Sequence, residues 1–261
     1  MNKNILNDKK EYLGRGIYAV VSKAHGFGTD ALLLAYFSNA KRKDRACDLG
    51  TGCGIIPLLW CREGACKSIS AVDIQEKAIK QLEKAIIISE LEEGRIQPVL
   101  ADLKEIQNSL SREAYDLVTI NPPYKALNSG IKSSDGAQAI ARHELHCSLN
   151  DAAKAANILL RFGGRFCICQ RPERLSEVFS AMKANAIEPK RMRLVVQSLE
   201  KAPWLVLVEG RKGGRPGMTI EPNLALKNKE GQHSPEMLKV FGPYYENEFR
   251  TPKALQAKDE V

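Results

Sequence analysis

The sequence has no run of apolar residues long enough to span a lipid bilayer, for which about 18–20 residues are needed. The first ten residues, MNKNILNDKK, also lack the apolar segment of a secretory signal peptide. Both absences argue against a membrane protein and against a secreted one. We therefore expect a cytoplasmic protein without a membrane partner.

Paired metal-binding cysteines are also missing. The chain has seven cysteines and four histidines, but no two cysteines form a C-x-x-C pair, whereas structural zinc sites use paired ligands at short spacing. We expect no metal and seven reduced cysteines, because disulfide frameworks are typical of secreted chains. Cys167 and Cys169 alternate in the strand-like run RFCIC, which predicts that both point to one face of a sheet.

Positive charge is abundant but uneven. The chain carries a net charge of +8, and 44% of its residues are apolar, as in ordinary globular proteins. Residues 161–216 contain 12 Lys and Arg against 5 Asp and Glu, whereas residues 1–160 contain 21 against 19 and residues 217–261 contain 6 against 7. This concentration favours a phosphate-rich partner, although a solvated basic face explains the charge equally well.

Short apolar segments alternate with amphipathic ones along most of the chain. This alternation predicts an α/β fold with a mostly parallel sheet and helices on both faces. The expected strands are 45–49, 68–73, 96–102, 115–120, 165–169, 193–197 and 204–209, and the expected helices are 29–38, 55–62, 76–88, 137–160 and 172–185.

Three sections follow from this pattern. Residues 1–44 form an N-terminal extension with short strands and a helix, residues 45–226 form the main domain, and residues 227–261 form a polar tail that we expect to pack loosely. In parallel sheets, ligands bind at the carboxyl ends of the strands. The residues that follow each strand are therefore the candidates for chemistry.

A glycine-rich turn follows the first of these strands. Residues 48–54 read DLGTGCG, and alternate glycines let the backbone turn tightly and approach a ligand closely. Asp73 ends the next strand, 23 positions after Gly50, where a carboxylate can accept hydrogen bonds from ribose hydroxyls. Dinucleotide sites use G-x-G-x-x-G, and Asp48 would repel a pyrophosphate, so a nicotinamide oxidoreductase is disfavoured.

The runs DLGTGCG and AVD together resemble the S-adenosylmethionine fingerprint of the Rossmann-like class I methyltransferases. The resemblance implies S-adenosylmethionine as the cofactor and a mostly parallel seven-stranded sheet. The expected cofactor contacts are Thr29, Asp30, Asp48, Gly50, Thr51, Gly52, Gly54, Asp73, Ile74, Asp102 and Asn121.

Some of these cofactor contacts have a plainer alternative. In this family, a carboxylate at the place of Asp102 binds the adenine amino group, and the alternative is that Asp102 caps the helical segment that follows. Thr29 and Asp30, in the run FGTDALLLA, would lie near the methionine end of the cofactor. They could instead serve only as helix N-caps.

Two prolines end the fourth strand of the main domain. The run YDLVTI is followed by Asn121, Pro122, Pro123 and Tyr124, which we take as the catalytic residues. The Asn121 side-chain carbonyl and the Pro122 backbone carbonyl could both accept hydrogen bonds from a planar exocyclic amine, held rigid by the prolines. Tyr124 could stack on the base. A simple Asn-Pro turn that ends the strand is the alternative.

The arrangement DLVTINPPY resembles amino-methyltransferases that act on adenine N6, cytosine N4 or the glutamine amide. With FGTDALLLA, ARHE, RPERL, EPKRMR and RKGGRPG, residues 11–226 are similar to the bacterial tRNA adenine N6-methyltransferases that modify adenine 37 of valine tRNA. The resemblance implies a tRNA partner and a monomer or weak homodimer. The loop after Tyr124 departs from the family pattern, which leaves the substrate details open.

Basic residues near the predicted pocket and in the late basic segment are candidates for phosphate contacts. The candidates are Lys125, Arg142, Lys190, Arg191, Arg193, Arg211, Lys212 and Arg215. Flexible backbone around the later ones would suit such contacts.

Three other functions share parts of this pattern. A protein-glutamine methyltransferase carries the same N-P-P-Y, but residues 1–44 are too few for the helical domain of that family. An rRNA or DNA amino-methyltransferase also fits the motif, although a DNA enzyme would usually need a large recognition domain. A non-catalytic RNA-binding protein would keep the fold and bind no S-adenosylmethionine.

Overall fold

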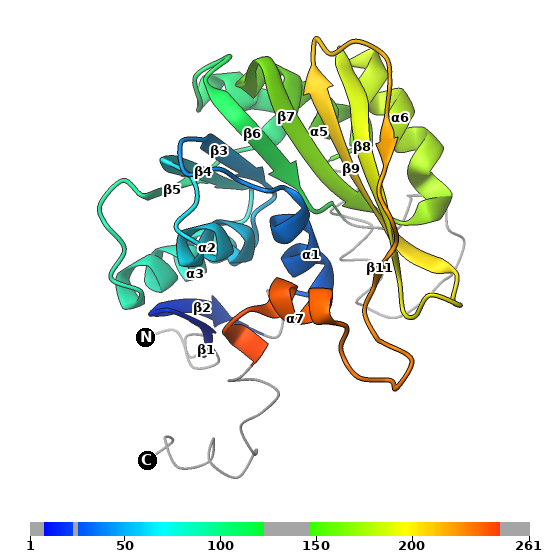
Figure 1. Cartoon of the computed structure of the whole chain (residues 1–261). Helices are drawn as coiled ribbons and strands as arrows, with labels where there is room; N and C mark the ends of the chain where they lie inside the picture. Colours follow the sequence, from blue (N-terminus) through cyan, green and yellow to red (C-terminus); the bar gives the residue numbers. More distant parts are fainter. Residues whose placement is uncertain (1–7, 23–25, 123–146, 246–261) are drawn as a thin grey trace, which may run out of the picture.

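The computed structural model describes residues 8–22, 26–122 and 147–245 (Figure 1). Pro123, Tyr124, Lys125 and Arg142 therefore lie outside the described residues, as does the first part of the helix predicted for 137–160.

One large sheet forms the centre of the molecule, with the order β8-β9-β7-β6-β3-β4-β5 for its seven long strands (Figure 1). All neighbours on this path are parallel except β9, which is antiparallel to both β7 and β8. The long strands are β3 (Arg45–Leu49), β4 (Ser68–Asp73), β5 (Ile96–Leu100), β6 (Tyr115–Ile120), β7 (Leu160–Gln170), β8 (Ile187–Val196) and β9 (Pro203–Lys212). The two-residue strands β10 (Thr219–Ile220) and β11 (Leu224–Ala225) pair with β8. The predicted mostly parallel seven-stranded sheet is confirmed.

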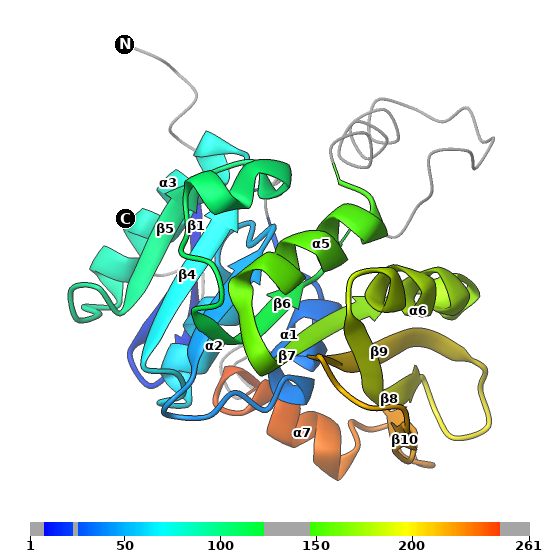
Figure 2. The same ribbon diagram turned by 90° about the horizontal axis from the view of Figure 1, so that it is seen from above.

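Helices cover both faces of the sheet, as Figure 2 shows from above. One face carries α1 (Thr29–Phe37), α2 (Ile55–Arg62) and α3 (Glu76–Ile88), and the other carries α5 (Leu149–Leu159), α6 (Leu175–Ala184) and the 3-10 helices η1 (Leu103–Asn108) and η2 (Pro172–Arg174). Side chains alternate between these two cores because the strand period is two. Cys167 and Cys169 pack on the α1 side, as predicted, and Phe166 and Ile168 pack on the α5 side.

The connection between α5 and β7 differs from the expectation. The sequence predicts a helix to residue 160 and a strand from residue 165, but α5 ends at Leu159 and β7 begins at once with Leu160. Gly163 has a φ of +75°, and the pairing of β6 with β7 shifts register here, between Tyr115 and Leu117. Gly163 and Gly164 therefore form a bulge inside the strand, and the spacing of apolar residues in the sequence does not predict such a bulge.

The described part of the C-terminal section, residues 227–245, is more ordered than the predicted loose tail. Helix α7 (Pro235–Phe241) begins with the Ser234 hydroxyl accepting a hydrogen bond from the Met237 N–H, and Met237, Val240 and Phe241 are buried in the core beside α1. The prediction failed because a seven-residue helix derives its stability from tertiary burial and carries little local signal.

Both ends of the described chain meet at α2. The N-terminal hairpin of β1 (Lys9–Gly14) and β2 (Ile17–Val21) packs beside α2 and α3. The buried guanidinium of Arg62 donates hydrogen bonds to the carbonyl oxygens of Leu13 and Phe241, at 3.2 and 2.9 Å. One side chain thus ties the first hairpin and α7 to the main domain.

Candidate functional site

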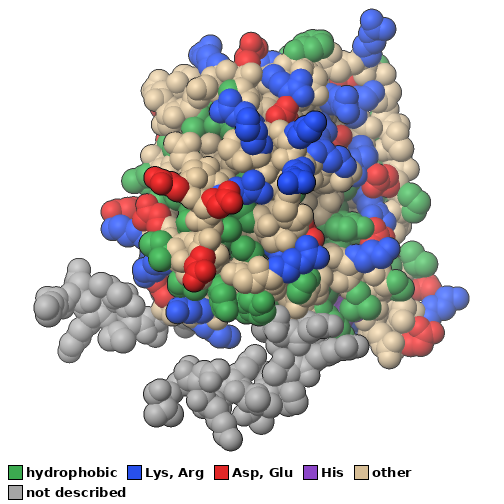
Figure 3. Space-filling view, turned by 60° about the vertical axis from the view of Figure 1, so that its left-hand side comes forward, with side chains coloured by type: hydrophobic (Ala, Val, Ile, Leu, Met, Phe, Trp, Pro, Cys, Tyr) green, Lys and Arg blue, Asp and Glu red, His purple; other side chains and the backbone are tan. Residues whose placement is uncertain are grey.

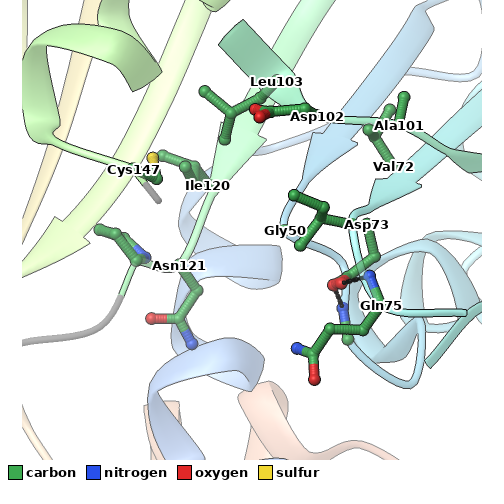
Figure 4. A pocket seen from close by; sticks show the side chains of 13 residues that line it. Gly50, Val72, Asp73, Gln75, Ala101, Asp102, Leu103, Ile120, Asn121 and Cys147 are labelled. Carbon is green, nitrogen blue, oxygen red and sulfur yellow. Dashed lines mark hydrogen bonds between the residues drawn. The ribbon is translucent and has the colours of Figure 1, made fainter. Parts of the chain in front are cut away.

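A cleft of about 250 Å³ opens at the carboxyl ends of β3, β4 and β6 and the start of η1 (Figure 4). Its lining is mostly apolar and backbone, with a few carboxylate and amide groups. The lining residues are Gly50, Gly52, Val72, Asp73, Ile74, Gln75, Ala101, Asp102, Leu103, Ile120, Asn121, Pro122 and Cys147. This is the edge at which parallel sheets bind ligands.

The glycine-rich turn forms one wall. Gly50, Gly52 and Gly54 have φ values of +63°, +56° and +81°, which side chains other than glycine rarely adopt. The Thr51 N–H donates to the Val72 carbonyl at 2.9 Å, which holds the turn against β4. Gly54 does not line the cleft; it begins α2, and a Cβ built there would lie 2.4 Å from Cδ1 of Leu82.

Asp73 braces this turn. Its side chain is 6% exposed and accepts hydrogen bonds from the backbone N–H groups of Gly52 at 2.8 Å and Gln75 at 2.9 Å (Figure 4). Each carboxylate oxygen has a second lone pair, so Asp73 can still accept hydrogen bonds from two neighbouring hydroxyls in the cleft. Ile74, 46% exposed, adds an apolar surface beside it.

The position of Asp102 suits both of its predicted roles, the helix cap and the contact to the adenine amino group. Its Oδ1 accepts a hydrogen bond from the Lys104 N–H at 2.9 Å and caps η1, which is the plainer alternative considered above. The residue also lines the cleft across from Asp73 (Figure 4). A carboxylate that caps with one oxygen keeps the other for an amino group.

A second hollow, of about 270 Å³, adjoins the cleft and shares Gly50, Gly52 and Asn121 with it. Asp48 lies in its wall, 1% exposed, and accepts a hydrogen bond from the Thr119 hydroxyl at 2.6 Å. Burial raises the pKa of Asp48 to about 7, although the hydroxyls of Thr119 and Thr51 oppose the shift. A cation in this hollow would stabilise the ionised carboxylate.

The start of α1 closes the far side of the second hollow. Gly28 is the N-cap residue of α1 and makes no side-chain cap, so the prediction that Thr29 or Asp30 caps this helix was wrong. Asp30 Oδ1 instead accepts from the adjacent Ala31 N–H at 2.9 Å, and Asp30 lines the hollow, while Thr29 is outside its lining.

Asn121 lies where the two hollows meet. Its side-chain Oδ1 is 3.0 Å from the Sγ of Cys169 on β7, so the buried thiol donates to the amide oxygen. Pro122 follows as a buried wall of the cleft. The two described members of the N-P-P-Y run thus lie beside the predicted cofactor contacts.

Two of the predicted phosphate contacts, Arg191 and Arg193, have partners inside the fold. Arg191 donates to Glu209 at 2.8 Å and to the Phe37 carbonyl at 2.6 Å, and so caps the carboxyl end of α1. Arg193 forms a bidentate pair with Glu236, at 2.6 and 2.7 Å. Their backbone belongs to β8, so the flexible segment expected there is wrong for these residues.

The remaining predicted phosphate contacts among the described residues differ in how far their side chains are exposed. Lys212 donates to Glu113 and to the carbonyls of Asn157 and Leu160, all within 2.9 Å. Lys190 is half-buried and donates to the Arg215 carbonyl at 3.1 Å. Arg211 and Arg215 are exposed. Because β9 is antiparallel, Arg211 pairs in register with Arg165 near the start of β7, at the edge of the sheet opposite Asn121.

Six residues that line the cleft were missed by sequence reasoning: Val72, Gln75, Ala101, Leu103, Ile120 and Cys147. Gln75 lies two positions after Asp73 and Leu103 directly follows Asp102, so the rule that sites follow strands would have found both. Cys147 precedes α5 and carries no comparable signal. Burial raises the pKa of its thiol to about 12, so it is a neutral wall.

Within the described ranges, no group of three or more His, Cys, Asp and Glu residues is arranged to hold a metal ion. Nor does any helix of those ranges have the length and apolar character needed to cross a membrane.

Comparison with protein families matches residues 18–145 to the methyltransferase small domain. Among curated relatives, a tRNA1(Val) (adenine(37)-N6)-methyltransferase of Tolumonas auensis is 29% identical over 84% of this chain and 89% of its own length. A protein of the same name from Parabacteroides distasonis is 28% identical over 70% and 75%. One from Yersinia pseudotuberculosis is 26% identical over 84% and 85%.

Solved structures agree on the fold. A protein from Agrobacterium tumefaciens, described as a predicted O-methyltransferase, superposes with a TM-score of 0.63 at 18% identity, covering 81% of this chain and 95% of its own. The tRNA m1G37 methyltransferase of M. jannaschii gives 0.53 at 18% identity, over 80% and 58%. The similarity of fold is that of the Rossmann-like class I methyltransferases.

Proposed function

The chain belongs to the family of methyltransferase small domains, and from this premise we propose that it transfers the methyl group of S-adenosylmethionine to N6 of an adenine in tRNA, with adenine 37 of valine tRNA as the target. The curated relatives at 26–29% identity carry that activity in their names. The seven cysteines are free thiols, which is consistent with the reducing cytoplasm where tRNA is modified.

The two hollows fit the proposed cofactor. S-adenosylmethionine, when bound, supplies a methyl group activated on a sulfonium. Asp73 would accept from its ribose hydroxyls, Asp102 from its adenine amino group, and Ile74 would cover the adenine ring. Without the cofactor, burial raises the pKa of Asp48 to about 7. Asp48 would face the ammonium group of the bound cofactor, and the ionised carboxylate would form a charged pair with it.

Asn121 carries the proposal, because its side chain lines both hollows. The lone pair of an exocyclic adenine amine is delocalised into the ring, so the amine is a poor nucleophile. The Asn121 amide oxygen and the Pro122 carbonyl would accept its two hydrogens and direct the lone pair toward the methyl group. No base is required before the transfer, since the product amine sheds its proton to water.

The substrate base would have to leave its stack to reach this position. We assign stacking on the flipped base to Tyr124, next to the two prolines. Lys125 and Arg142 stay predicted RNA contacts, and the tRNA partner follows from the substrate. We propose a monomer or weak homodimer as the active form.

The test is methyl transfer to total tRNA followed by nucleoside analysis. Protein is incubated with tritiated S-adenosylmethionine and unmodified tRNA, and the digested nucleosides are separated by mass spectrometry. We expect label in N6-methyladenosine from valine tRNA alone. Label in protein would support the glutamine methyltransferase instead, and the absence of any S-adenosylmethionine binding in calorimetry would support a non-catalytic RNA-binding protein.

A further inference from the structure

The edge of the sheet opposite Asn121 carries a continuous row of exposed cations. This edge holds the loops before β3, β4 and β6, the first residues of β7 and the turn after β9. We call the exposed cations here the amino edge. They are Arg42, Lys43, Arg45, Lys67, Arg112, Arg161, Arg211 and Arg215.

The topology brings these residues together from segments that are far apart in sequence. Strands β9, β7, β6, β3 and β4 are consecutive neighbours, and adjacent strands lie about 4.8 Å apart, so the row spans about 20 Å. Lys and Arg side chains gather over the upper half of the face in Figure 3. Such a length admits several phosphates of one nucleic-acid strand.

Three acids at this edge form ion pairs, whereas Glu188, in register with Arg211 on the adjoining strand, forms none with a described residue. Asp44 pairs with Arg165 at 2.7 Å, Asp116 pairs with Arg161, and Glu113 pairs with Lys212 at 2.9 Å. No ion pair joins the other seven amino-edge cations to a described residue. The row ends toward β5, where Glu90, Glu92 and Glu93 follow α3. The unpaired cations at this edge therefore outnumber the unpaired acids, and the local potential is positive.

An exposed aromatic ring lies within the row. Phe162 is 77% exposed, at the start of β7 beside Arg161. Its ring packs over Gly213, where a Cβ would lie 2.2 Å from the ring, so the turn after β9 holds the ring in place. A fixed aromatic face among cations is the combination that binds single-stranded or unpaired nucleotides by stacking.

We propose that the amino edge is a second RNA-binding surface, which holds the tRNA at a site away from the modified nucleotide. The inference rests on the proposed function for the identity of the RNA. Arg112, Arg211 and Arg215 contact phosphates, and Phe162 stacks on an unpaired base. Strands β8 and β9 are each ten residues long and span about 33 Å, so the tRNA passes over about that distance along this side of the sheet to reach both edges.

The test compares a triple variant, Arg112→Gln with Arg211→Gln and Arg215→Gln, against the wild type. On full-length tRNA we expect KM to rise about tenfold or more with kcat unchanged. The slope of log K against log salt should fall by about 2–3, because each lost phosphate contact removes about 0.7–0.9. On a short anticodon stem-loop the two proteins should have equal kcat/KM.

The matched control removes three charges elsewhere. Lys9→Gln, Lys10→Gln and Lys229→Gln alter exposed residues on β1 and in the loop before α7, and should leave KM and salt slope unchanged. Phe162→Ser should weaken tRNA binding about tenfold with the salt slope unchanged, because stacking releases no counterions.

Two outcomes overturn the inference while the proposed function stands: a triple variant with wild-type KM and salt slope, or a control variant that changes as much. If the wild type binds tRNA through the amino edge but transfers no methyl group, the proposed function fails and the second surface stands.

Discussion

The thiol of Cys169 donates a hydrogen bond to the side-chain carbonyl of Asn121, with Sγ and Oδ1 3.0 Å apart. Cys169 is fully buried in β7, next to the end of β6. The amide of Asn121 is thereby held with its oxygen in a defined direction. A thiol is a weak donor, and the oxygen keeps a second lone pair, so it can still accept from a substrate amine.

The first prediction concerns this contact. Cys169→Ala should lower kcat about three- to tenfold, because Asn121 loses its orienting donor, while cofactor affinity and the KM for tRNA change little. Cys167→Ala is the control, since Cys167 is equally buried on the same face but lies next to Glu209. Steady-state kinetics decide the matter, and equal losses in the two variants would show that packing alone is responsible.

Replacing Asn121 itself should have a larger effect. Asn121→Ala removes one of the two proposed acceptors and should lower kcat by about 10²–10³, the usual effect of losing one positioned hydrogen-bonding group. Cofactor affinity, measured by calorimetry, should stay nearly intact. Unchanged turnover would remove Asn121 from the mechanism.

Asp48 should make cofactor binding pH-dependent. Burial raises its pKa to about 7 in the free protein, so protonation favours the folded state below pH 4, and this contribution is lost as the pH rises through 7. An ammonium ligand needs the ionised form. Affinity for S-adenosylmethionine should therefore increase between pH 5.5 and 7, where the amino group of the cofactor stays protonated.

Asp48→Asn provides the comparison for that measurement. It should bind more weakly and show a flat profile over the same range. A wild-type affinity that is independent of pH between 5.5 and 7 would mean that Asp48 does not face the ammonium.

The Arg193–Glu236 pair should contribute to stability. Arg193→Ala and Glu236→Ala should each lower the free energy of unfolding, and the double variant should show a coupling of about 1 kcal/mol, since the bidentate pair is partly exposed. Denaturant unfolding gives the three values. Additive losses would show that α7 is held by its apolar face alone, and a rise in the KM for tRNA at unchanged stability would restore Arg193 as an RNA contact.

Gly54 and Gly64 give a matched pair of glycine substitutions. Both have positive φ, +81° and +64°, so alanine costs each about 1 kcal/mol. At Gly54 the new Cβ also meets the buried side chain of Leu82, whereas nothing lies within 4 Å of it at Gly64. Thermal unfolding should show a larger loss of stability for Gly54→Ala than for Gly64→Ala. Equal losses would mean that the Leu82 side chain moves aside without an energetic cost.

Much of the site could be predicted because its residues follow strands in the sequence. The strand period and the glycine spacing are local properties, so Asp48, Gly50, Gly52, Asp73 and Asn121 could all be assigned to one edge of a parallel sheet. The helix cap at α1 was missed for a related reason: Gly28, Thr29 and Asp30 are all acceptable near a helix start, and only the backbone decides between them.

Tertiary structure decides which Lys and Arg residues form ion pairs inside the fold and which face solvent. Arg193 and Glu236 are 43 residues apart, and Arg191 meets Phe37 across 154 residues, so no local pattern separates a structural arginine from one that faces solvent. Local patterns along the chain were enough to predict an α/β sheet, a cleft at its carboxyl edge and an excess of positive charge. Strand order and register decided which charges pair inside the fold and which form the amino edge, because both depend on contacts between distant segments.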